Sequence, residues 1–225
     1  MKPLSSILNA LPPTKIIDAE INISDYVPLN LSVSNQELID AKLETSHDFE
    51  NYIFNYLKEK KARVAFGGYI EGRLLYQRST IFFNESKPER NIHIGLDLWT
   101  NAGTQVLAAL DGKVHSFKNN EGLGDYGPTI ILEHAVENEK FYTLYGHLSL
   151  ESIENLKIGD YFKKGDQIAT LGESSVNGDY APHVHFQIIH NIENYWGDYP
   201  GVCNAKDLNF YIENCPDPNL LLKIT

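Results

Sequence analysis

The sequence predicts a mainly β protein: a compact antiparallel sandwich or distorted barrel, with a helical N-terminal extension and a short C-terminal helix. Two observations predict this fold. Short alternating apolar runs recur over residues 63–190, separated by turns that contain glycine, such as Asp111-Gly112. Helical spacing is confined to residues 1–62 and to residues 205–214. Antiparallel strands joined by short turns are typical of sandwiches and small barrels.

The chain has 225 residues, enough for one hydrophobic core with a small appendage. We divide it into an extension (1–62), a β-rich domain (63–190) and a tail that packs on this domain (191–225). Apolar residues make up 42% and charged residues 22%, which is ordinary for a soluble globular protein. The net charge of −11 disfavours nucleic acids and anionic membranes as partners. The oligomeric state stays open.

The extension is expected to begin with mostly extended or irregular chain over residues 1–33. The S-x-x-E spacing from Ser34 to Glu37 is that of a capping box and predicts a short helix. A longer helix is predicted from Ser46, with acidic residues early, lysines late and apolar residues at helical spacing: Phe49, Ile53, Tyr56 and Leu57. We expect its apolar face to pack on the β domain; a dimerisation or partner-docking helix is the alternative.

Residues 63–90 are β-like and rich in aromatic and basic side chains. Short strands with glycine between them are predicted over 63–66, 67–78 and 80–83. Candidate substrate contacts here are an arginine for a carboxylate and tyrosines as donors to an oxyanion: Arg73, Tyr69 and Tyr76. Ordinary positions on a strand surface are the alternative.

Two histidines lie two residues apart in the stretch Ala181–Gln187. In a strand, His183 and His185 point to the same face, while Val184 and Phe186 point into a core. Both imidazoles can converge on one ion, or one can bind it while the other transfers a proton. Two ordinary strand histidines are the alternative.

A second stretch places His93 and Asp97 on one face of a strand. A straight strand would hold their Cα atoms about 13 Å apart, so we expect a bulge at Gly95 to bring them together. With one histidine of the later pair, they make a His-Asp-His ligand set. Such a set suits zinc and leaves a fourth position open for water, as in catalytic sites.

The strands between these stretches are predicted from alternation and turns. Residues 104–117 give two strands, 129–134 and 140–145 form a hairpin, and 158–171 give two short strands. The hairpin delivers His147, which follows Tyr145-Gly146. His115 is expected to lie on the surface, and His134 is expected to be structural or exposed.

The order H-x-x-x-D (93–97), a histidine after a strand (147) and P-H-x-H-F (182–186) resembles the lysostaphin-type zinc metallopeptidases, peptidoglycan endopeptidases that cut peptide cross-bridges. The resemblance covers roughly residues 90–190. It implies a fold like the duplicated hybrid motif, zinc as the cofactor and a peptide or peptidoglycan-like substrate. Carried over by position, the resemblance implies that His93, Asp97 and His185 are the zinc ligands. It also implies that His147 and His183 are the catalytic histidines.

Two features depart from the family pattern. Residues 173–180 replace a short turn and are expected to reshape one wall of the cleft. Gln187 occupies a position at which some relatives carry Glu. We expect its side chain to fix a ligand imidazole or to contact the substrate; a plain position on a strand surface is the alternative. Tyr145, close to His147, is a further candidate substrate contact.

The tail and the tyrosine-rich stretch before His93 are similar to a peptidase-like module fused in some bacterial proteins to kinase-like and class III aminotransferase domains. That similarity implies a small intracellular peptide or amide substrate. A catalytically silent binding module and a phosphocarrier-like module are further alternatives. The filled ligand positions argue against a silent binding module, and Asp97 argues against a phosphocarrier-like module.

Residues 1–13 lack the pattern of a signal peptide, and no run approaches the roughly 18 apolar residues that span a bilayer. We therefore expect a cytoplasmic protein, or an extracellular or periplasmic one if a targeting segment was removed. In a reducing compartment, Cys203 and Cys215 are expected to be separate thiols.

Overall fold

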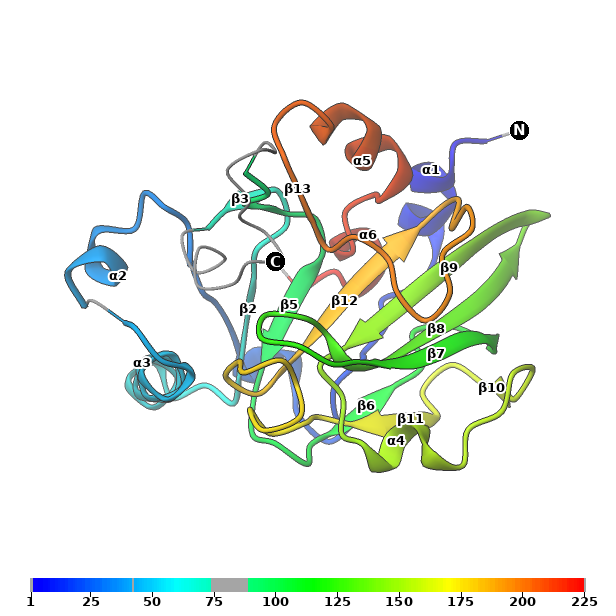
Figure 1. Cartoon of the computed structure of the whole chain (residues 1–225). Coiled ribbons are helices and arrows are strands. Elements are labelled where there is room, and N and C mark those ends of the chain that lie inside the picture. The colour runs from blue at the N-terminus through cyan, green and yellow to red at the C-terminus, as the bar shows by residue number, and fades with distance from the viewer. Residues whose placement is uncertain (1, 42, 74–88, 225) are drawn as a thin grey trace.

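The computed structural model describes residues 2–41, 43–73 and 89–224, and its centre is an eight-stranded sheet (Figure 1). Neighbouring strands are antiparallel except for the pair β1 and β2. In sheet order the strands are β1 (Tyr26–Pro28), β2 (Val64–Gly67), β5 (Leu96–Trp99), β12 (His183–Ile189), β9 (Glu139–Gly146), β8 (Gly127–Val136), β7 (Gly112–Asn120) and β10 (Tyr161–Phe162).

Two small antiparallel sheets accompany the large one. The first pairs β6 (Gln105–Leu107) with β11 (Gln167–Thr170), and the second joins β13 (Val202–Cys203), β4 (Ile92–His93) and β3 (Glu71–Gly72). The predicted fold class is confirmed, since the chain is mainly β with antiparallel sheets and has helices towards both ends. The strand predicted over 80–83 lies outside the described residues.

The helices lie mostly at the two ends of the chain. They are α1 (Leu4–Ala10), the 3-10 turn η1 (Ile23–Asp25), α2 (Gln36–Ala41), α3 (Ser46–Lys60), α4 (Glu151–Glu154), α5 (Leu208–Asn214) and α6 (Asn219–Leu222). As predicted, α3 begins at Ser46. The short helix α2 begins at Gln36, where Asn35 rather than Ser34 accepts a hydrogen bond from the backbone N–H of Glu37. None of the helices in the described part of the chain is long and apolar enough to cross a membrane.

The expectation of extended or irregular chain over residues 1–33 was wrong for α1. Leu4, Ile7 and Leu8 follow helical spacing and are buried. The segment is held at its far end by Lys223, whose ammonium group donates to the carbonyl oxygens of Asn9 and Leu11. This helix is therefore stabilised by contacts with the opposite end of the chain, which local sequence patterns do not reveal.

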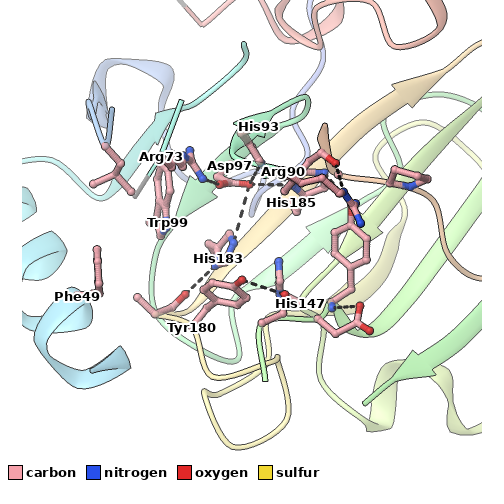
Figure 2. A pocket seen from close by; sticks show the side chains of 18 of the residues that line it. Phe49, Arg73, Arg90, His93, Asp97, Trp99, His147, Tyr180, His183 and His185 are labelled. Atoms are coloured by element: carbon pink, nitrogen blue, oxygen red, sulfur yellow. Dashed lines mark hydrogen bonds and ion pairs between the residues drawn. The ribbon is translucent and has the colours of Figure 1, made fainter. Parts of the chain in front are cut away.

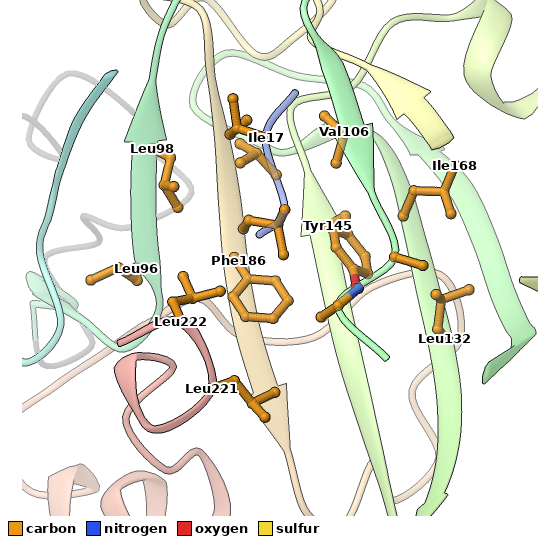
Figure 3. Packing of buried hydrophobic residues seen from close by; sticks show 14 of the residues in the cluster. Ile17, Leu96, Leu98, Val106, Leu132, Tyr145, Ile168, Phe186, Leu221 and Leu222 are labelled. Carbon is orange, nitrogen blue, oxygen red and sulfur yellow. The ribbon is translucent and has the colours of Figure 1, made fainter. Parts of the chain in front are cut away.

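The main hydrophobic core lies on one face of the large sheet (Figure 3). Val184 and Phe186 of β12 point into this core, together with Leu96 and Leu98 of β5. Because side chains alternate along a strand, His183, His185 and Gln187 of β12 point to the opposite face. The packing that fixes β12 and β5 thereby also fixes which side chains face the other way. Both cysteines, Cys203 and Cys215, are buried and unpaired.

Candidate metal centre

Three strands bring together the three side chains predicted as metal ligands. His93 lies on β4, Asp97 on β5 and His185 on β12, and the register of β5 and β12 places His185 opposite Asp97. Gly95 lies where the chain leaves the small sheet and enters the large one. A Cβ atom at this glycine would lie 2.4 Å from the His185 ring, so the close approach requires glycine.

The three candidate ligand atoms converge on one point. Nε2 of His93 lies 2.8 Å from Nδ1 of His185, and Oδ1 of Asp97 lies 3.3 Å and 3.1 Å from these two atoms respectively. All three side chains are buried. Ligand atoms about 2.0 to 2.1 Å from a tetrahedral zinc ion would be about 3.3 Å apart, so the observed spacing is close to that of atoms around one ion.

Hydrogen-bond partners assign the tautomer of both ligand histidines. Nδ1–H of His93 donates to the Gly68 carbonyl (2.8 Å), and Nε2–H of His185 donates to Oε1 of Gln187 (2.9 Å). The Gln187 amide is held in this orientation because its Nε2 donates to the Pro200 carbonyl. The ring nitrogens that face each other therefore carry lone pairs, and together with a carboxylate oxygen they fit a cation.

A buried arginine completes the charges around the centre. Nη1 of Arg73 donates to Oδ2 of Asp97 and its Nε to Oε2 of Glu71, each at 2.6 Å. Burial alone would raise the pKa of Asp97, but His93 and Arg73 outweigh burial and hold this pKa well below its usual range. Burial, reinforced by Arg73, lowers the pKa of His93 to about 3. Neutral imidazole and ionised carboxylate are the forms that bind metals.

Two further histidines lie beside this triad (Figure 2). The ring centroids of His147 and His183 are 4.2 Å apart, and Nε2 of His183 lies 3.9 Å from Oδ1 of Asp97. Nδ1–H of His147 donates to the Asn177 carbonyl and Nδ1–H of His183 to the Ala181 carbonyl, each at 2.7 Å. Their Nε2 atoms are therefore free of protons. Burial is the largest cause that lowers the pKa of both rings.

All five predicted histidine and aspartate positions line one pocket of about 260 Å³. His147 adopts a left-handed backbone conformation (φ 63°) directly after β9, which turns its ring toward the pocket from the end of the strand. The loop before β12 supplies Tyr180 and Ala181 to the same pocket, so the segment 173–180 does form part of its wall. The centre is thus a buried ligand set that opens into a cavity.

The candidate substrate contacts are distributed differently. Arg73 lines the pocket but is paired with Asp97. Tyr69 lies away from the pocket, where its hydroxyl donates to the Cys215 carbonyl. Tyr145 belongs to the core, where its hydroxyl accepts from the Ala109 amide, so its prediction as a substrate contact is corrected. Tyr76 lies outside the described residues.

Gln187 is also corrected as a substrate contact, because it is fully buried behind His185 and serves to orient that ring. Among the aromatic residues of the pocket that sequence reasoning missed, two lie beside the histidines. Trp99 is stacked on His183, with ring centroids 5.7 Å apart, and its position two residues after Asp97 on the same strand would have placed it on this face. Tyr126, 5.1 Å from the His185 ring, comes from a loop and has no periodicity to reveal it.

Two imidazoles and one carboxylate form a buried ligand set. This set opens into a cavity lined by two more neutral histidines, and together these groups define a candidate metallohydrolase centre. Residues 91–195 match Peptidase family M23. This match supports a lysostaphin-type metallopeptidase family for this part of the chain.

Curated relatives match over the same part of the chain. Lysostaphin of Staphylococcus staphylolyticus is 36% identical over 101 residues, which are 44% of this chain and 19% of that protein. The glycyl-glycine endopeptidase ALE-1 of Staphylococcus capitis is 35% identical over 102 residues, 44% of this chain and 25% of that protein. The chain therefore spans only a quarter or less of the length of these relatives.

Among solved structures, the catalytic domain of the antimicrobial peptidase lysostaphin from Staphylococcus simulans is similar to this chain. The alignment has 25% sequence identity and a TM-score of 0.42, and it covers 75% of this chain and 98% of that domain.

Proposed function

We propose that this protein is a zinc-dependent peptidase that hydrolyses an amide bond in a peptide or peptidoglycan-like substrate. The observation that carries the proposal is the convergence of His93 Nε2, Asp97 Oδ1 and His185 Nδ1 in a pocket that all three residues line. The match to Peptidase family M23 and the endopeptidase relative support the choice of reaction.

The donor atoms favour zinc over other common metals. Two imidazole nitrogens and one carboxylate oxygen are typical zinc ligands, whereas magnesium and calcium prefer sets made of oxygen alone. Three protein ligands leave a coordination position for water or substrate. When bound, zinc would polarise the substrate carbonyl and lower the pKa of a water molecule from 15.7 to about 7.

His183 is the proposed general base. Its Nε2 carries a lone pair, faces the pocket and lies 3.9 Å from Oδ1 of Asp97, so it sits beside the proposed metal position. Its Nδ1–H is held by the Ala181 carbonyl, which stabilises the imidazolium formed when Nε2 accepts a proton. The protonated ring can then pass this proton to the leaving amine.

His147 is proposed to orient the attacking water. In the tautomer assigned by the Asn177 carbonyl, its Nε2 can accept a hydrogen bond but cannot donate one. It therefore suits an interaction with a water hydrogen before the reaction better than one with the negatively charged oxygen formed later. The lowered pKa of His147, caused first by burial, keeps this ring neutral at pH 7.

The proposal is tested by substituting the proposed base without touching a ligand. His183→Ala should retain zinc but hydrolyse peptides about 10² to 10⁴ times more slowly, because proton transfer is lost. Zinc content by elemental analysis and hydrolysis of a peptide panel by mass spectrometry provide the two readouts. His115→Ala, outside the pocket lining, is the control and should retain both. A His183→Ala protein without zinc would contradict the separation of roles.

A further inference from the structure

One wall of the pocket is apolar, and much of it comes from the N-terminal extension. Leu31, together with Phe49 and Ile53 of α3, lines the pocket beside Trp99 and Ala181. The residues of the extension lie outside the segment 91–195 that matches the peptidase family. Leu31, Phe49 and Ile53 thus reach the pocket from outside the matched segment, whereas Trp99 and Ala181 belong to it.

This apolar wall begins at the proposed general base. The Trp99 indole is stacked on His183 with an interplanar angle of 25°, and the Arg73 guanidinium lies 5.6 Å from the centre of the same indole. Figure 2 shows Phe49 and Trp99 on the side of the pocket where His183 lies. A group seated against this wall would therefore be adjacent to the bond under attack.

The wall is held in place by contacts that connect distant parts of the chain. The Ser46 hydroxyl, at the start of α3, donates to Oδ1 of Asp179 in the loop that carries Tyr180. The Tyr56 hydroxyl of α3 donates to the Pro28 carbonyl at 2.7 Å. Helix α3 is therefore joined both to the edge of the sheet and to the neighbouring wall of the pocket.

Other parts of the pocket lining are polar. Arg90, Asp125 and Asp198 contribute charged side chains, and Tyr126 contributes a phenol. In Figure 2, Arg90 lies beyond His185, away from Phe49 and Trp99. The pocket thus presents an apolar side and a polar side to a ligand bound at the metal centre.

We propose that the wall formed by Leu31, Phe49, Ile53 and Trp99 is a subsite for a bulky apolar side chain next to the scissile bond. The preferred substrates are then peptides that carry phenylalanine or leucine at this position rather than glycine. This inference rests on the proposed peptidase function and adds the class of substrate. A glycyl-glycine bond, which the relative ALE-1 is named for, offers no side chain to such a wall.

Binding can be tested without turnover. The zinc-loaded protein is titrated calorimetrically with the hydroxamates of phenylalanine, leucine and glycine, which share one zinc-binding group and differ in the side chain. Burial of the side chain should make the two apolar compounds bind about 10 to 100 times more tightly than the glycine compound. Equal affinities, tighter binding of glycine hydroxamate or no binding at all would overturn the subsite.

A matched pair of variants on α3 then locates the contact. Phe49→Ala should remove most of the preference for phenylalanine hydroxamate and leave the affinity for glycine hydroxamate within about twofold. Asn51→Ala, on an exposed position of the same helix, should preserve the preference. An unchanged preference in Phe49→Ala would contradict the assignment. The comparison of hydroxamates uses the wild-type protein and stands even if a variant fails to fold.

Hydrolysis separates this inference from the proposed function. Pentaglycine is compared with pentapeptides in which phenylalanine replaces each glycine in turn, and kcat/KM is measured for each. We expect the best phenylalanine peptide to exceed pentaglycine at least about tenfold. If the protein prefers apolar hydroxamates but hydrolyses no peptide, the subsite is supported and the peptidase function is contradicted. If it hydrolyses peptides without preferring apolar side chains, the peptidase function is supported and the subsite is contradicted.

Discussion

At the scale of single residues, each histidine of the centre is held in one tautomer by an oxygen that only accepts hydrogen bonds. The carbonyls of Gly68, Asn177 and Ala181 hold three of the rings, and Oε1 of Gln187 holds the fourth. In this tautomer, the second nitrogen of each ring carries a lone pair that points away from the oxygen partner. The fold itself arranges these lone pairs, so binding of a cation would carry a lower cost of ordering the ligands.

Gln187 provides the clearest test of this arrangement. Gln187→Leu should weaken zinc binding about 10- to 100-fold, because His185 loses the partner that fixes its tautomer and ring orientation. The measurement is a competition titration with a chromophoric chelator. Gln167→Leu makes the same change at an exposed position of β11 and should leave the affinity unchanged. Wild-type affinity in Gln187→Leu would show that His185 is oriented by other contacts.

The five residues of the centre were predictable because short motifs carry them, but their partners were not. The role of Arg73 shows the reason. It pairs with Asp97, 24 positions further along the chain, and is 2% exposed. Before the fold is known, an arginine in a β-like stretch suggests a contact with solvent or substrate. Burial and pairing are properties of the tertiary structure, and no sequence periodicity encodes them.

At the scale of elements, α3 connects the extension to the pocket. Its first turn has a full capping box, in which the Thr45 side chain accepts from the Asp48 amide and the Asp48 carboxylate accepts from the Thr45 amide. Local sequence predicted the start of this helix correctly. It did not predict that the apolar face of α3 would also form a wall of the pocket that holds the candidate metal centre.

Removing the cap should destabilise the protein by a measurable amount. Thr45→Ala should lower the free energy of unfolding by about 1 kcal/mol, because the amide of Asp48 loses its acceptor. Urea denaturation followed by circular dichroism measures the change. Thr45→Ser retains a hydroxyl and should stay within about 0.5 kcal/mol of the wild type. If both variants were equally stable, the cap would not contribute to the stability of the fold.

Strand β8 contains a histidine that should make stability depend on pH. His134 is buried, with Nδ1 bonded to the Asp111 carbonyl and Nε2 paired with the Thr143 hydroxyl. Burial lowers its pKa to about 4. Because the unfolded chain takes up this proton near pH 6.5, stability is full above that pH and falls as the pH drops toward 4.

The loss attributable to His134 is about 3 kcal/mol between pH 6.5 and 4. Urea denaturation at several pH values gives the free energy of unfolding of the wild type and of His134→Gln. The contribution of His134 is the difference between the two proteins in how steeply this free energy changes with pH. The variant should lose less stability on acidification. His47→Gln changes an exposed histidine and serves as the control. Equal slopes for wild type and His134→Gln would refute the assignment.

At the scale of the whole molecule, the position of the centre follows from the order of strands in the sheet. Strand β12 lies between β5 and β9, so His185 meets Asp97 on one side, and the end of β9 brings His147 close. Alternation in the sequence gave the strands and the face that each side chain occupies. The order of strands could not be read in this way, because it depends on pairing between segments about 40 to 90 residues apart.

Zinc content, measured by elemental analysis, tests the proposed metal centre most directly. The wild type, Asp97→Ala and Asp198→Ala are loaded with zinc and freed of loosely bound metal before the measurement. Wild type and Asp198→Ala, which loses a carboxylate of the same pocket outside the triad, should hold about one zinc ion per chain, and Asp97→Ala almost none. A wild type that stays free of zinc, or full retention in Asp97→Ala, would contradict the metal centre described here.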